Sequence, residues 1–290
     1  MIVAGLLAAL AALMLVFATA VVGEARARGE LRPRAEVVVL GFVTNFFDTL
    51  GIGSYAPSTA WLKLRRLVPD GYIPAVLNVG HAIPTFVEAL IFIRLVKVDP
   101  WLLAACIAAS AAGAVVGAPI VARLPIRAVQ GVVGAALVLA AAAFVAANLG
   151  LTPDGGTAIQ LGPGAFAAAV AVYFVLGALM MCGIGLYAPS LVMFSLLGLD
   201  TRVAFPIMMG ACAFLMPAGG IGFLRSRRID LRVIVSIALG GPPAVLLAAL
   251  VVKSLPLSAI RWGVVVVVLY TAVLLLRSAA SREPAEAAAA

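Results

Sequence analysis

Charged side chains are scarce in this sequence. Only 11% of its 290 residues are Asp, Glu, Lys or Arg, whereas a water-soluble domain carries about 25%. This scarcity excludes an ordinary soluble enzyme or binding domain. The formal net charge of +8 does not indicate nucleic-acid binding, because membrane proteins also gather Lys and Arg in their cytoplasmic loops. We therefore expect a lipid bilayer, and no nucleic acid, among the partners of this chain.

Residues that bind metals or form disulfides are scarce too. The chain has one histidine, His81, and three cysteines, Cys106, Cys182 and Cys212. The cysteines form no Cys-X-X-Cys pair and all lie in apolar stretches, so the sequence predicts neither a disulfide framework nor a metal site. It predicts no cofactor either. Cys182 is interpreted as a small apolar residue rather than a reactive thiol.

Long apolar runs, in contrast, are abundant. Most are about 20 residues long, which is the length of a helix that crosses a bilayer. The runs are residues 2–23, 37–62, 73–93, 100–122, 126–148, 164–197, 203–224, 233–252 and 257–276. The first run has no basic residue before it, so we interpret it as a retained helix rather than a signal peptide. The sequence thus predicts an all-α polytopic membrane protein.

One eight-residue motif occurs twice. Gly51-Ile-Gly-Ser-Tyr-Ala-Pro-Ser58 returns 132 residues later as Gly183-Ile-Gly-Leu-Tyr-Ala-Pro-Ser190, with seven of eight positions identical. Both copies interrupt a long apolar run with glycine and proline. Discontinuous helices of this kind, in matching positions of two halves, are typical of the binding sites of secondary transporters.

Further matches extend the duplication to two repeats. Pro74 corresponds to Pro206, and Leu124-Pro125 corresponds to Leu255-Pro256. We expect each repeat to combine a Gly-broken or re-entrant helix pair with three spanning helices. The predicted organisation is an N-terminal transmembrane helix with a cytoplasmic linker (1–35), repeat 1 (36–148), an external linker (149–163), repeat 2 (164–278) and a disordered cytoplasmic tail (279–290).

The distribution of basic residues bears on the orientation of the repeats. If residues 37–62 and 164–197 form re-entrant hairpins, fifteen of the twenty basic residues fall on one side. If both runs cross fully, the split is twelve to eight, which satisfies the positive-inside rule less well. Hairpins leave each repeat with three crossings, so the repeats are predicted to be inverted, with a cytoplasmic C-terminus in a bacterial inner membrane. Kinked spanning helices remain the alternative.

A break within an apolar helix exposes the amides that begin the next half-helix. Two such N-termini meeting near the midplane would form a positive pocket for an anion without any buried cation. Close helix packing through small residues is the alternative explanation. The predicted substrate-binding residues at the breaks are Gly51, Gly53, Ser54, Tyr55, Gly183, Gly185, Leu186 and Tyr187, with Ser58 and Ser190 as further hydroxyl donors.

Repeat 1 carries most of the polar residues predicted to lie at membrane depth. Asn45 and Asp48 precede the first break, and Asn78 and His81 share one face of the following helix. We add Asn45, Asn78 and His81 to the predicted substrate site. Asp48 and His81 are the predicted coupling or gating residues, because a free histidine side chain titrates near neutral pH and Asp48 could pair with His81. A plain hydrogen bond between helices is the alternative for His81. Glu88, a turn and a half before Arg94, is interpreted as a structural residue that reaches the interface, with a functional role as the alternative.

Several segments resemble those of a known transporter family. They are Asn45-Phe-Phe-Asp-Thr-Leu-Gly-Ile-Gly-Ser54, Leu77-Asn-Val-Gly-His81, residues 179–190 and Phe205-Pro-Ile-Met-Met-Gly210. With these motifs, residues 36–278 resemble the TauE/SafE family of sulfite and organosulfonate exporters. The resemblance implies a proton- or ion-coupled carrier of sulfur-containing anions or small organic acids. The family's commoner form has further glycines after Gly-Ile-Gly, where this chain has Ser54-Tyr55 and Leu186-Tyr187.

The leading prediction is a secondary transporter that moves a small anion, sulfite or an organosulfonate, across the inner membrane. An anion channel or facilitator and a carrier for small carboxylates remain open alternatives, as does a homodimer. An intramembrane enzyme that uses Cys182 or His81 is disfavoured, because no nucleophile, base and orienting residue occur at a matching spacing. The chain is therefore predicted not to be an enzyme.

Overall fold

The computed structural model of the chain describes residues 2–117, 125–149, 156, 158–226, 228–254 and 257–280. Within these ranges the fold is all helical, as the sequence predicts, apart from an isolated bridge between Ala158 and Leu199. The predicted tail beyond residue 280, part of the predicted 149–163 linker and the end of the 100–122 run lie outside the described residues.

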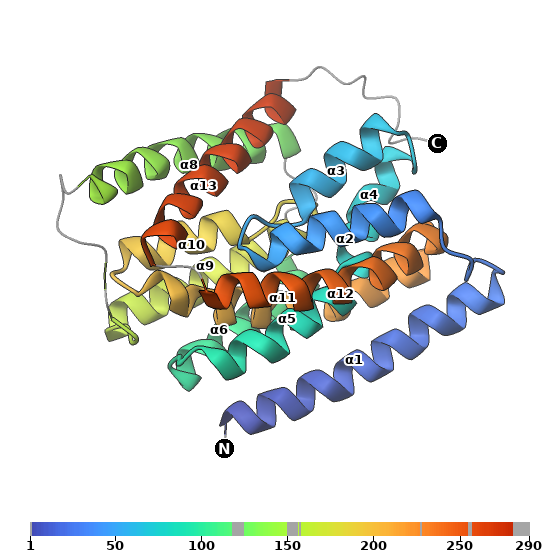
Figure 1. Ribbon diagram of the computed structural model, residues 1–290, viewed down its shortest axis with the longest axis horizontal. Helices are drawn as coiled ribbons and strands as arrows, with labels where there is room; N and C mark the ends of the chain where they lie inside the picture. Colours follow the sequence, from blue (N-terminus) through green and yellow to red (C-terminus); the bar gives the residue numbers. More distant parts are fainter. Residues whose placement is uncertain are drawn as a thin grey trace.

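The elements follow the apolar runs closely, and the two longest runs are each divided in two. They are α1 (Ile2–Ala27), α2 (Ala35–Thr49), α3 (Tyr55–Leu64), η1 (Asp70–Tyr72), α4 (Ile73–Gly80), α5 (Ala82–Leu95), α6 (Pro100–Ala112), η2 (Gly113–Gly117), α8 (Ile126–Asn148), α9 (Pro163–Met181), α10 (Tyr187–Leu196), α11 (Thr201–Ser226), α12 (Leu231–Ser254) and α13 (Leu257–Ala280). In Figure 1, α1 lies along one edge of the molecule, and α8 crosses α13 along the opposite edge.

Five segments of the described chain are long and apolar enough to cross a membrane. They are Ile2–Ala27, Asp70–Leu95, Pro163–Met181, Thr201–Arg225 and Leu231–Val251. Shorter apolar helices cover Pro100–Val116, Tyr187–Leu196 and Val268–Ala280. An all-helical chain with this many apolar helices is suited to a bilayer, because a helix satisfies its backbone groups internally.

Helix α1 packs through a single stripe. Its buried residues are Leu10, Met14, Phe17, Val21 and Ala25, which recur every three or four positions and therefore share one face. The remaining faces carry exposed apolar side chains. Only 17% of the residues in its most apolar 18-residue stretch are buried inside the protein. Exposed apolar faces of this kind suit contact with lipid rather than water.

Each broken helix pair folds back on itself. The Glu36 carboxylate in the first turn of α2 lies 2.7 Å from Nε of Arg65, which directly follows α3. In the second pair, Ala158, five residues before α9, exchanges backbone hydrogen bonds with Gly198 and Asp200, which follow α10. The outer ends of each pair therefore lie together, and this geometry favours the re-entrant alternative over kinked spanning helices.

Glycines hold the long arms of these pairs against other helices. A Cβ atom on Gly240 of α12 would collide with the carbonyl of Val38 in α2. Likewise, a Cβ on Gly177 of α9 would collide with the carbonyl of Ser110 in α6. Small residues allow membrane helices to approach this closely. The arm α2 is thus fixed against α12, and the arm α9 against α6.

Candidate functional site

Helix α2 ends in a Schellman motif at the first Gly-Ile-Gly sequence. The amide of Ile52 donates to the backbone carbonyl of Phe47 at 3.0 Å, and the amide of Gly51 donates to the backbone carbonyl of Asp48 at 2.8 Å. Gly51 has a φ of +91°, in the left-handed region that glycine adopts without strain. The helix therefore stops here, and α3 begins at Tyr55.

Helix α9 ends in the same way at the second copy of the motif. The amide of Ile184 donates to the carbonyl of Leu179 at 3.2 Å, and that of Gly183 donates to the carbonyl of Met180 at 3.0 Å. Gly183 has a φ of +87°, and α10 begins at Tyr187. Both helices thus break at the Gly-Ile-Gly motifs, as the sequence predicts, and for the same physical reason.

The tips of the two broken pairs face each other. A Cβ atom placed on Gly53 would lie 3.9 Å from the Cβ of Tyr187, and one placed on Gly185 would lie 3.7 Å from the Cβ of Tyr55. Each tip therefore sets a glycine against the tyrosine that begins the other short helix. Residues far apart in the sequence are brought together in this way.

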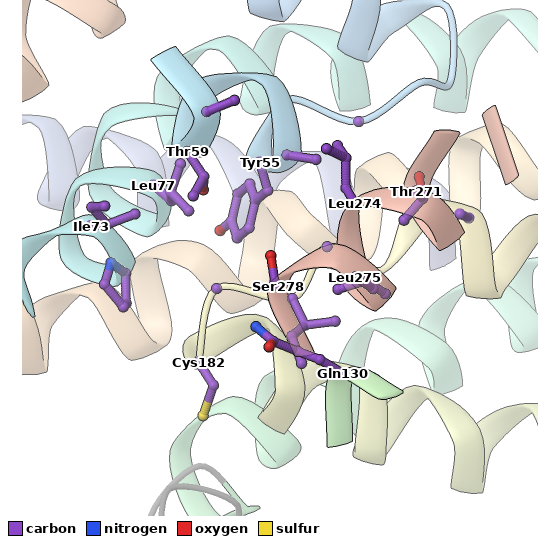
Figure 2. Close-up of a pocket in the computed structure, with 18 of the residues that line it drawn as sticks. Tyr55, Thr59, Ile73, Leu77, Gln130, Cys182, Thr271, Leu274, Leu275 and Ser278 are labelled. Carbon is purple, nitrogen blue, oxygen red and sulfur yellow. The ribbon is translucent and has the colours of Figure 1, made fainter. Parts of the chain in front are cut away.

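A cavity of about 450 Å³ lies beside the tips. Its volume falls within the usual range of small-molecule sites. Figure 2 shows Tyr55 and Leu77 on one side, Gln130 and Ser278 on the other, and Cys182 at the lower end of this view. Of the predicted substrate-binding residues, those that line the cavity are Gly53, Tyr55, Gly183, Gly185 and Tyr187.

Several polar residues of the lining were not identified from the sequence. They come from α3, η1, α8 and α13 and are Thr59, Lys63, Asp70, Arg127, Gln130, Thr271 and Ser278. Nζ of Lys63 lies 3.7 Å from the carboxylate of Asp70, so the charges of the lining are partly compensated. Arg127 and Gln130 are three residues apart in an apolar run. This spacing gives α8 a polar face and is the signal by which they can be recognised.

Asp48 lies behind the first tip rather than in the cavity. Its Oδ1 accepts a hydrogen bond from the amide of Ser54 at 2.6 Å, and the residue is 2% exposed. The chain's own carboxylate thus occupies the N-terminal end of α3, where the sequence predicts an anion site. Ser54 is buried beside it and does not line the cavity. The residue corresponding to Asp48 at the second break is Met180, which brings no carboxylate to α10.

His81 forms a closed set of hydrogen bonds between helices. Its Nδ1 lies 2.9 Å from Oδ1 of Asn45, and its Nε2 lies 3.0 Å from Oγ of Ser58. The Asn45 amide nitrogen donates to the carbonyl of Gly41, so its oxygen faces the ring and Nδ1 is the donor. The expected pairing of His81 with Asp48 is therefore wrong, because both ring nitrogens are already engaged elsewhere. Neither Asn45 nor His81 lines the cavity.

Asn78 links the two breaks. Its Oδ1 accepts a hydrogen bond from the hydroxyl of Tyr55 at 2.8 Å, and its Nδ2 donates to the carbonyl of Met180 at 3.1 Å. Tyr55 begins the short helix of the first break, and Met180 is near the end of the long helix of the second. Asn78 is fully buried and outside the lining, so it positions the site rather than contacting a solute.

Glu88 is placed differently from the sequence-based expectation. It does not reach the interface, because it is completely buried. Its Oε1 accepts a hydrogen bond from the hydroxyl of Thr49 at 2.7 Å, and its Oε2 accepts one from the hydroxyl of Tyr187 at 3.0 Å. Tyr187 lines the cavity, so Glu88 lies one residue away from any solute bound there.

Two further predicted site residues pack away from the cavity. A Cβ on Gly51 would lie 3.1 Å from the ring of Phe205, and Leu186 is completely buried. The hydroxyl of Ser190 is buried as well and has no hydrogen-bond partner among the described residues. Gly51 and Leu186 thus belong to the tips but face the protein interior and do not line the cavity.

The three cysteines differ in access to the cavity. Cys182 lines it and is partly exposed, whereas Cys106 and Cys212 are buried, and all three thiols are free. In the part of the chain that the structure describes, no group of three His, Cys, Asp or Glu side chains could hold a metal ion.

No family model, curated protein or solved structure matches this chain. The resemblance to the TauE/SafE family therefore stays a prediction based on the motifs.

Proposed function

We propose that this protein is a secondary carrier that moves a small anion across a bacterial inner membrane and binds it in the cavity between the two helix breaks. The observation that supports this proposal best is the meeting of the tips. Gly53 lies against Tyr187 and Gly185 against Tyr55, in a protein whose other helices are largely apolar. A closely packed bundle without a solute would have no need of two interrupted helices at membrane depth.

The second break is where the anion binds. Its short helix, α10, begins at Tyr187 with amides that have no partner within the helix. The preceding Leu186 contributes no side-chain cap, and both Gly183 and Gly185 line the cavity. The helix N-terminus and the glycine backbone favour a negative group. The first break offers less, because Asp48 already accepts the hydrogen bond of Ser54.

Two inverted repeats account for the packing of the broken pairs. The arm α2 packs on α12, and the arm α9 packs on α6, so each arm contacts a helix from the other half of the chain. Inversion would bring the two hairpins in from opposite sides, with the C-terminus and most basic residues in the cytoplasm. Alternating access then requires one set of arms to move against the other around a central site.

The size and lining of the cavity favour an organosulfonate over sulfite alone. A volume of about 450 Å³ leaves room for an organic group besides the anionic head. Leu77, Leu274 and Leu275 line it together with the two tyrosines, so a short carbon chain finds apolar contacts. Small carboxylates fit the same description and are tested alongside.

Protection of Cys182 from a thiol reagent tests binding directly. Purified protein is treated with a maleimide in the presence of taurine, a longer alkanesulfonate or acetate; sulfite is used only in the transport assay, because it adds to maleimides. We expect the sulfonates to slow labelling of Cys182, because it lines the cavity, while Cys106 and Cys212 stay unlabelled because they are buried. Cys182→Ser is the matched control and should remove the signal.

Transport is then measured in proteoliposomes with the same labelled solutes. A carrier should show faster uptake when unlabelled solute is present on the opposite side, whereas a channel should not. Uptake of none of these anions, together with unprotected Cys182, would exclude the proposal. Uptake without acceleration by the opposite side would replace it with a facilitator.

A further inference from the structure

Glu88 is a fully buried acid on α5 whose only polar partners, among the described residues, are hydroxyl groups. These are Thr49 on Oε1 and Tyr187 on Oε2. The described basic side chains form no ion pair with it. A buried carboxylate without a cation is strongly unfavourable, whereas a neutral carboxylic acid with two hydrogen bonds is readily accommodated.

The geometry at Thr49 indicates where the proton lies. The single hydroxyl hydrogen of Thr49 has two acceptors within reach, the carbonyl of Asn45 at 2.9 Å and Oε1 of Glu88 at 2.7 Å. One hydrogen cannot serve both acceptors fully. A proton on Oε1 resolves the conflict, because Glu88 then donates to Thr49 and Thr49 donates to Asn45.

We propose that Glu88 is the proton site of the carrier, holding a proton in the described conformation and exchanging it with the cavity through the hydroxyl of Tyr187. This inference rests on the proposed function for its link to transport, but the protonation of Glu88 stands on the geometry alone. It places proton coupling on a residue whose partner lines the cavity, not on His81 or Asp48.

The transfer involves only O–H bonds. Rotation of the carboxyl group about Cγ–Cδ brings its protonated oxygen to Tyr187. The tyrosine oxygen accepts this proton while its own hydroxyl proton passes to a water molecule or an anion in the cavity. Glu88 is left as a carboxylate that still accepts hydrogen bonds from Tyr187 and Thr49, because a hydroxyl can act as donor or acceptor. The reverse sequence reloads the site.

The other titratable groups around Glu88 have different surroundings. Asp48 from α2, Tyr187 from α10 and Cys212 from α11 interact with it electrostatically. Asp48 caps α3 through Ser54, and Cys212 contacts Met180. The membrane-depth parts of α1, α4 and α12, which also pack near α5, carry no titratable side chains. His81, at the junction of α4 and α5, has both ring nitrogens engaged away from the cavity.

Infrared spectroscopy of the purified protein tests the protonation without any assumption about transport. A carboxylic acid has a C=O stretching band that a carboxylate lacks. We expect this band in the parent protein at neutral pH, its loss in Glu88→Gln and its retention in Asp48→Asn. Absence of the band from the parent protein, or its survival in Glu88→Gln, would overturn the inference. Glu88→Gln keeps the size and hydrogen-bonding capacity of the side chain, and size-exclusion chromatography confirms its fold.

Addition of taurine or sulfite then tests the link to the cavity. We expect either solute to shift or weaken the band in the parent protein, and Tyr187→Phe to keep the band but abolish this response. An unchanged response in Tyr187→Phe would disprove the route through the tyrosine.

In proteoliposomes, Glu88→Gln should retain exchange of solute for solute but lose uptake driven by a pH gradient. Retained pH-driven uptake would overturn the coupling role. If instead taurine does not protect Cys182 and neither solute is transported, the proposed function fails while the infrared result for Glu88 still stands.

Discussion

The two helix breaks share the motif that ends the long helix but differ at their second glycine and in their side chains. Gly53 has a φ of +86°, whereas Gly185 does not have a positive φ. Both stop a long helix with a left-handed glycine, Gly51 or Gly183, and both start a short helix at a tyrosine. Around the first break the chain places Asp48, Thr49 and Asn45 within a buried hydrogen-bond network. The corresponding positions of the second break are Met180, Met181 and Gly177, none of which has a hydrogen-bonding side chain like those of the first break.

On our proposal, this difference gives the two halves separate functions, proton handling at the first break and solute binding at the second. The shared helix ends bring the two tips into contact beside the cavity. The polar network fixes the first tip to α4 and α5 and, on our proposal, manages a proton. On our proposal, the amides of the second tip bind the solute, because Met180 stands there in place of Asp48. On the same proposal, the matching helix ends serve one solute and the diverged side chains serve one coupling ion.

Removing the link between the breaks should have the largest effect. Asn78→Ala leaves the hydroxyl of Tyr55 buried without its acceptor, at about 1–3 kcal/mol, and removes one of two hydrogen bonds to the carbonyl of Met180, which keeps the amide of Gly183, at about 1 kcal/mol. We expect this loss in the free energy of unfolding in detergent, measured by chemical denaturation. Tyr55→Phe, the matched control, breaks only one of the two bonds and should cost about 1 kcal/mol. Equal losses in the two variants would show that Asn78 does not connect the second break.

Substitution of the glycines tests whether α2 and α9 end by the same backbone motif. Gly51→Ala and Gly183→Ala each force a side chain into the left-handed region, at about 1–2 kcal/mol. Gly51→Ala also places its Cβ 3.1 Å from the ring of Phe205, so it should be the worse of the two.

Gly185→Ala is the control for this pair. Gly185 does not have a positive φ, and its nearest neighbour to an added Cβ is 3.7 Å away. We expect a change below about 0.5 kcal/mol in the same denaturation experiment. A large loss at Gly185, or none at Gly183, would mean that the two tips are not held by the same backbone motif.

The sequence was sufficient for the helices and the breaks because these depend on local rules. Apolar runs of spanning length and a glycine that can adopt a positive φ are both visible in the chain. The continuous α11 is a partial exception. Pro206 and Pro217 lie inside it without ending it, whereas the corresponding helix of the first half is divided at His81 into α4 and α5.

The site was predicted only in part, since side-chain partners depend on tertiary packing. Tyr55 and Tyr187 were identified because they are repeated, but their partners Asn78 and Glu88 differ. The position of Glu88 near Arg94 in the sequence suggested the interface, yet packing of α5 among α11 and α12 buries it. No local pattern places α8 and α13 beside the tips, so their polar residues were missed.

The smallest expected effect concerns the outer ends of the two hairpins, where the melting temperature should depend on salt through the first hairpin only. In the first hairpin the Glu36 carboxylate accepts hydrogen bonds from Nε of Arg65 and Nε1 of Trp61, so an exposed ion pair joins α2 to the end of α3. In the second, backbone hydrogen bonds of Ala158 with Gly198 and Asp200 do the same. Exposed ion pairs contribute little and are screened by salt, whereas backbone hydrogen bonds are not charged. Arg65→Ala and Glu36→Gln should therefore each lower the melting temperature slightly at low salt, without adding to each other in the double variant, and both should match the parent protein at high salt. Additive losses, or losses that persist at high salt, would show that these residues stabilise the first hairpin by packing instead of charge.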